Sequence, residues 1–150
     1  MSSEQESGSG RIVVGVDPSD ASKAALAWAV KQAAVTGGSV DAVTAWQVPA
    51  VYGYVYSMTP EMSELDQNVR KGLEEAVAEA ARLAPEVKVR ALVAQDNPAD
   101  ALLNVAKGAD LLVVGSRGHG GFTGALLGSV SQHCVHYAEC PVVVVRGAQR

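Results

Sequence analysis

The sequence predicts an α/β fold: a single open, parallel, five-stranded sheet with strand order 3-2-1-4-5 and helices on both faces. Two observations predict it. Short apolar runs alternate along the chain with longer stretches of helical periodicity, which is the pattern of successive β-α-β units with right-handed crossovers. Three of the runs, 12–16, 111–115 and 141–145, are apolar almost throughout, as expected for strands that are buried on both faces of a parallel sheet.

The other two strands are predicted from alternating runs. The alternation is partial in 39–46, whereas in 87–93 Val and Ala residues fall on one side and Lys88 and Arg90 on the other. One wetter face is typical of a strand near a sheet edge. Because the most apolar strands belong at the centre, the first and fourth strands are placed in the middle, and the equally apolar fifth strand is an exception that needs cover.

Four helices are expected between the strands, over 20–36, 60–84, 98–106 and 129–138. Ser19 is the expected N-cap of the first helix, and Gly37 follows its end. Thr59 and Asn97 each precede a proline, and a cap followed by a first-turn proline is a helix-start signal.

Composition bounds the architecture and excludes several function classes. Residues 1–10 hold nothing to bury and are expected to form a disordered tail, with 11–150 as one domain. Lys and Arg number 12 against 16 Asp and Glu, a net charge of −4, which disfavours nucleic acids and anionic membranes. No apolar run approaches the roughly 20 residues of a membrane span. Two cysteines without framework spacing favour a reducing cytoplasm.

A ligand site is expected where the first and fourth strands end, because sheets of this topology bind ligands at that switch point. Residues 17–20 read DPSD, and neither G-x-G-x-x-G after the first strand nor G-x-x-x-x-G-K-[ST] anywhere is present, which disfavours a dinucleotide site and a P-loop. Segment 115–131 holds six glycines and leads into a helix at Gly128 and Ser129. Glycine backbone and a helix N-terminus both favour bound anions. The segment therefore predicts a phosphate cradle, with a surface loop as the alternative.

The spacing Gly115-x2-Gly118-x9-Gly128-Ser129 resembles the nucleotide-binding signature of the ATP-binding universal stress proteins. Segments 14–29, 109–118 and 140–146 are similar to that family as well. The resemblance implies a flavodoxin-like (Rossmann-like) fold, a homodimer and a cytoplasmic stress or dormancy role. It implies ATP as ligand, with Mg or Mn, and cyclic AMP as the alternative, because some actinobacterial relatives are associated with that nucleotide.

The predicted nucleotide-binding residues are Val16, Asp17, Ala45, Val114, Gly115, Ser116, Arg117, Gly118, Gly128, Ser129, Val130 and Ser131. The resemblance places the motif glycines and Ser129 at the ribose and phosphates, and Ser131 is expected at the terminal phosphates. Asp17 either accepts from the ribose hydroxyls, helps to hold a divalent metal, or caps the following helix. Ala45 either meets the adenine, as the resemblance implies, or packs within the sheet. Arg117 either pairs with phosphate or is a solvated charge.

The sequence favours a regulatory nucleotide-binding protein over an enzyme. No catalytic residue is predicted, because no obvious general base and no P-loop lysine lie beside the cradle. Asp17 and His119 are the nearby candidates for a general base. A slow ATPase or phosphotransferase is the alternative. His133 and His136 are spaced to share a metal, but no fourth ligand is evident, so zinc is not expected. A tyrosine of the 52–56 stretch either covers the adenine or packs at the sheet edge or a dimer partner.

The fifth strand predicts a homodimer through 141–146. Its valines carry no charge or bulge between Pro141 and Arg146, and such an edge is prone to pair with another strand. The same strand of a second copy, antiparallel across a two-fold axis, would cover it. Cover by the N-terminal tail or by a helix is the alternative.

Overall fold

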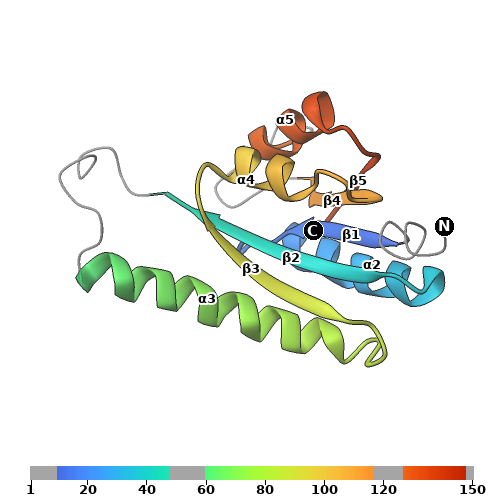
Figure 1. The fold of residues 1–150 in the computed structure, drawn as a ribbon, viewed down its shortest axis with the longest axis horizontal. Helices are drawn as coiled ribbons and strands as arrows, with labels where there is room; N and C mark the ends of the chain where they lie inside the picture. The colour runs from blue at the N-terminus through green and yellow to red at the C-terminus, as the bar shows by residue number, and fades with distance from the viewer. Residues whose placement is uncertain (1–9, 48–59, 117–126, 148–150) are drawn as a thin grey trace.

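The computed structural model describes residues 10–47, 60–116 and 127–147, with the side chains of α3 described from 64 onward. The elements are β1 (Arg11–Gly15), α2 (Asp20–Thr36), β2 (Ser39–Trp46), α3 (Pro60–Ala81), β3 (Val89–Gln95), α4 (Pro98–Val105), β4 (Leu111–Gly115), α5 (Ser129–Tyr137) and β5 (Val142–Val145). The strands form a five-stranded parallel sheet in the order β3-β2-β1-β4-β5 (Figure 1). The predicted fold class and strand order are confirmed.

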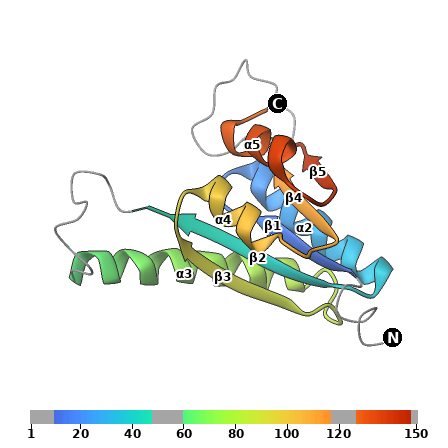
Figure 2. The ribbon, with the colours of Figure 1, turned by 45° about the horizontal axis from the view of Figure 1, so that its top comes forward.

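Helices cover both faces of the sheet (Figure 2). Helices α2 and α3 pack on one face and α4 and α5 on the other. Right-handed crossovers of parallel strands produce this arrangement. Residues 117–126 follow β4 and lie outside the described residues, as do 48–59 between β2 and α3.

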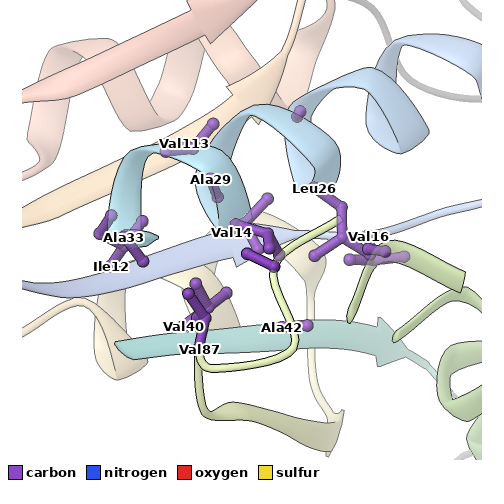
Figure 3. Packing of buried hydrophobic residues seen from close by; sticks show 14 of the residues in the cluster. Ile12, Val14, Val16, Leu26, Ala29, Ala33, Val40, Ala42, Val87 and Val113 are labelled. Atoms are coloured by element: carbon purple, nitrogen blue, oxygen red, sulfur yellow. The ribbon is translucent and has the colours of Figure 1, made fainter. Parts of the chain in front are cut away.

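The core is divided between the two faces because successive strand residues point to opposite sides. Ile12 and Val14 of β1 meet Leu26 and Ala29 of α2 on one face (Figure 3). Val13, between them, joins the second cluster with residues of α4, β4 and α5. Both clusters include fully buried residues of β1 and β4, so the two central strands are held from both sides.

The helix-end signals of the sequence act as expected at α2. The Ser19 hydroxyl accepts from the Ser22 N–H at 3.1 Å. Gly37 adopts φ 78°, a left-handed conformation that suits glycine, and its N–H donates to the Ala33 carbonyl. The predicted range 20–36 is therefore confirmed.

The third strand is shifted from its predicted range of 87–93 to Val89–Gln95. Val87 is buried, but its N–H donates to the Ala84 carbonyl in a turn. The apolar alternation thus begins in the turn, before the strand pairs with β2. At its other end Gln95 is still in register with Trp46, through backbone pairing that the side-chain pattern does not reveal.

A buried carboxylate joins three strands near their amino ends. Asp41 of β2 lies in register with Arg90 of β3 and its side chain is 7% exposed. Arg11 Nε donates to it at 3.1 Å, and Arg90 Nη2 donates at 3.0 Å. Arg11 also donates to the Val105 carbonyl at the end of α4. Buried charges require such pairing, and the network lies away from the carboxyl ends of the strands.

Candidate functional site

The first part of the candidate site is the turn that follows β1. Val16 is buried; its N–H donates to the Val43 carbonyl at 2.8 Å, and its carbonyl accepts from the Thr44 hydroxyl at 3.0 Å. Neighbouring β2 therefore fixes the backbone immediately before Asp17. Ala45, the predicted adenine contact, is the next residue of β2 and lies in register with Ala94.

Asp17 is held by the first turn of α2. Its backbone N–H donates to the Ser22 hydroxyl at 2.7 Å, and its carboxylate accepts from the Ser19 N–H at 2.8 Å. The N-cap itself is Ser19, so Asp17 accepts in the turn before the helix rather than capping it. The half-buried carboxylate stands at the carboxyl end of a central strand.

The second part of the site is the end of β4, where Val114 and Ser116 are buried and Gly115 is half-buried. The Ser116 N–H donates to the Val145 carbonyl at 2.8 Å, and its carbonyl accepts from the Gly128 N–H at 2.7 Å. The glycine-rich segment thus leaves β4 and returns to the same point, where α5 begins. Arg117 and Gly118, predicted nucleotide contacts, lie within 117–126, outside the described residues, as do His119 and the tyrosines of 52–56.

The start of α5 differs from the starts of α2 and α4. Ser19 and Asn97 cap those helices with side-chain hydrogen bonds. Gly128 is the N-cap of α5 and forms none. The first N–H groups of any helix lack acceptors within the helix, and the dipole makes this end positive. The N-terminus of α5, with exposed Ser129 and half-buried Val130, is therefore suited to bind an anion.

Gly115 brings the two parts together. A Cβ built on Gly115 would lie 2.8 Å from the Ala21 carbonyl carbon and 2.9 Å from its Cβ. Helix α2 therefore starts directly against the end of β4, one turn from Asp17. The sequence predicts Gly115 as a nucleotide contact. The structure adds a packing role at the same residue, which cannot be seen from the sequence because it depends on where α2 crosses β4.

Ser131 lies with its hydroxyl in the interior. The side chain is buried, and Oγ lies 3.1 Å from the Ser116 carbonyl and 3.0 Å from the Gly128 carbonyl. Ser22 is buried in a similar way behind Asp17 and was not among the predicted site residues. The spacing of serines in DPSDAS, 17–22, is the signal that could have identified it.

The His and Cys side chains of α5 divide between the core and the surface. Cys134 is fully buried, and burial, followed by the nearby Cys140, raises its pKa to about 11. His133 and His136 are exposed and contact the ring of Tyr137. Among the described residues no group of three or more His, Cys, Asp or Glu side chains could hold a metal ion. Nor, in that part of the chain, does any helix combine the length and apolar character needed to cross a bilayer.

The sequence of this chain is similar to those of known proteins. The family model described as "Universal stress protein family" matches residues 8–146. A universal stress protein of Mycolicibacterium smegmatis is 39% identical over 135 residues, covering 90% of this chain and 45% of that protein. The chain thus spans about half the length of the curated relatives it matches.

Two solved structures with similar folds are nucleotide complexes. One, a universal stress protein in complex with cAMP, is 28% identical with a TM-score of 0.67, covering 92% of this chain and 97% of that one. The other, a universal stress protein from Archaeoglobus fulgidus in complex with dAMP, is 25% identical with a TM-score of 0.63, covering 90% and 96%. Both ligands are adenine nucleotides.

Proposed function

The chain belongs to the universal stress protein family, and from that premise we propose that it is a regulatory protein that binds ATP at the carboxyl ends of β1 and β4. The observation that carries the proposal is the closure between Ser116 and Gly128, 2.7 Å from O to N. It anchors both ends of a glycine-rich segment beside an uncapped helix N-terminus. The two relatives solved with adenine nucleotides support the ligand class.

In this proposal the phosphates lie against the start of α5. The backbone N–H groups of Ser129, Val130 and Ser131 donate to phosphate oxygens, because this end of the helix concentrates unpaired donors and positive potential. Gly128 has no side chain to occupy the approach. Arg117 and Gly118 complete the phosphate contacts from the segment between Ser116 and Gly128.

The nucleoside lies toward β1 and β2. Asp17 accepts from the ribose hydroxyls, with Val16 and Val114 beneath and the backbone of Gly115 and Ser116 alongside. Ala45 meets the adenine at the end of β2. Mg²⁺ or Mn²⁺, when bound, neutralises phosphate charge, and Asp17 is the carboxylate suited to share it with the phosphate oxygens.

ATP binding is tested by calorimetry on the wild type and on Gly128→Val. A branched side chain would displace donors from the phosphates, and a charge-assisted hydrogen bond contributes roughly 1.5–3 kcal/mol, so affinity should fall at least about tenfold. Gly72→Val is the matched control, because a side chain at Gly72 on α3 meets nothing within 4 Å. Equal affinity in wild type and Gly128→Val removes Gly128 from the site.

Base selectivity separates ATP from other nucleotides. Adenine and guanine present opposite hydrogen-bond patterns at position 6, and backbone groups at the end of β2 can distinguish them. ATP should therefore displace GTP. Cyclic AMP is the second candidate ligand, favoured by the relative solved with that nucleotide; if it binds more tightly than ATP, the proposed role becomes cyclic AMP sequestration.

A regulatory role is proposed in preference to catalysis. In the described part of the cradle, the first turn of α5 supplies backbone N–H groups and the exposed Ser129 hydroxyl but no general base. Asp17, the nearby carboxylate, is assigned to the ribose and the metal in this proposal. A single-turnover assay with labelled ATP tests this. Turnover of bound ATP on mixing would favour the slow ATPase or phosphotransferase instead.

A homodimer through 141–146 is the proposed assembly. Within the described residues β5 pairs with β4 and no strand pairs with its other edge, while Val142–Val145 are all half-buried. Pairing with a second copy would satisfy those backbone groups and bury the valines. The two free cysteines support the cytoplasm as the proposed location.

A further inference from the structure

The two helices that start at the candidate site carry a buried serine at the same position. Ser22 is the third residue of α2, and Ser131 is the third residue of α5. They are 3% and 2% exposed. Each hydroxyl reaches back to the backbone at the end of the preceding central strand, β1 for Ser22 and β4 for Ser131.

The Ser22 hydroxyl bridges the backbone on both sides of Val16. It accepts from the Asp17 N–H at 2.7 Å and donates to the Gly15 carbonyl at 3.3 Å. Since a buried backbone donor is costly to leave without a partner, this hydroxyl determines the direction in which the chain turns after β1. Ser22 thereby sets the location of the Asp17 backbone, while its own hydroxyl is directed at the main chain.

The Ser131 hydroxyl acts at the second turn. It lies within hydrogen-bond distance of the Ser116 and Gly128 carbonyls, at 3.1 and 3.0 Å. These residues are the two ends of the segment that the Gly128 N–H closes onto Ser116. The hydroxyl therefore ties the start of α5 to the end of β4, and it is turned away from the exposed side of the helix.

We propose that Ser22 and Ser131 are positioning residues for the nucleotide: Ser22 places Asp17 at the nucleoside, and Ser131 places the N-terminus of α5 at the phosphates. This inference rests on the proposed function. It also refines the sequence-based expectation for Ser131, whose backbone N–H contacts phosphate while its hydroxyl holds the cradle in shape.

The two serines should affect different parts of the nucleotide, which a merely structural role would not do. Ser131→Ala should weaken ATP binding at least about tenfold and change adenosine binding less than about threefold, because adenosine has no phosphate. In titrations without Mg²⁺ or Mn²⁺, Ser22→Ala should weaken both ligands by similar factors, since Asp17 is placed at the nucleoside. Ser131→Thr keeps the hydroxyl and should restore ATP affinity.

Residues of the same two helices provide matched controls. Thr36→Val removes a hydroxyl from the last residue of α2, at the opposite end of the helix from the turn that holds Asp17. Gln132→Ala removes an exposed side chain beside Ser131 on α5. Both controls should bind ATP within about threefold of wild type. If Ser22→Ala does not fold, Ser22→Cys, of similar size and with a much weaker hydrogen-bonding group, takes its place.

The experiment is calorimetric titration of each folded variant with ATP and with adenosine. The proposal is overturned if Ser22→Ala and Ser131→Ala bind both ligands as wild type does, or if Ser131→Ala loses adenosine as strongly as ATP. It is overturned as well if Thr36→Val loses as much affinity as Ser22→Ala. A wild-type protein that binds neither ATP, cyclic AMP nor adenosine would instead contradict the proposed function itself, and the inference with it.

Discussion

Replacing Gly115 by alanine tests how closely α2 approaches the end of β4. The added Cβ would lie 2.8 Å from the Ala21 carbonyl carbon and 2.9 Å from its Cβ, whereas carbon atoms pack best at roughly 3.5–4.0 Å. The obstructing atoms belong to the backbone and a Cβ rather than to the end of a flexible side chain. Helix α2 must therefore move by several tenths of an ångström.

The expected cost follows from overpacking. Forced shifts of this kind destabilise proteins by about 1–3 kcal/mol, and we expect about 2 kcal/mol for Gly115→Ala. The free energy of unfolding is measured by urea denaturation followed by circular dichroism, with an unchanged m-value. Because the moved turn carries Ser22 and holds Asp17, ATP affinity should decrease as well.

Gly72→Ala is the control for the same chemical change. Gly72 is an exposed residue of α3, where an added Cβ meets nothing within 4 Å. Alanine is favoured over glycine in a helix by about 1 kcal/mol, so this variant should gain stability. The reasoning is refuted if Gly115→Ala is as stable as the wild type, because the close approach of α2 to β4 would then be absent in solution.

Three further outcomes are expected. Asp41→Asn should lower the free energy of unfolding by about 3 kcal/mol, because Arg11 and Arg90 lose a buried partner. The Arg90 side chain is 63% exposed, so Arg90→Ala should cost less than about 1 kcal/mol. Equal losses in urea denaturation would contradict the network. The pKa of Cys134 is raised to about 11 from an ordinary 9.0, so the folded state favours the neutral thiol. The contribution of Cys134 to stability is therefore full below pH 9 and falls by up to about 3 kcal/mol as the pH rises to 11. The stability advantage of wild type over Cys134→Ala should shrink over that interval, and a constant difference would refute the shift. Val143→Lys should yield folded monomers in sedimentation at micromolar concentration, whereas Val35→Lys, at an 82% exposed position of α2, should stay dimeric; a dimeric Val143→Lys protein would show that β5 is not the interface.

Features that depend on neighbouring residues in the chain could be predicted. The limits of α2 follow from Ser19 and Gly37 because a cap and a left-handed glycine act within one turn. The strand order follows from the apolar runs because central parallel strands have two buried faces. The predicted range of the third strand began two residues too early, because Val87 is buried in a turn that continues the alternation of the strand.

Features that depend on contacts between distant elements could not be predicted. Asp41 reads as a surface residue in a partly alternating run, and its partners on β1 and β3 appear only with the register. The packing role of Gly115 depends on where α2 crosses β4. The glycine motif indicated where the candidate site lies, while the inward orientation of the Ser131 hydroxyl required the closure between Ser116 and Gly128.

The most direct test of the central claim is calorimetric titration of the purified wild-type protein with ATP in the presence of Mg²⁺, followed by competition with GTP. The account predicts saturable binding of a single nucleotide to each chain, with ATP outcompeting GTP. Absence of binding by both ATP and cyclic AMP, or equal competition by GTP, would contradict an adenine-nucleotide site at the ends of β1 and β4.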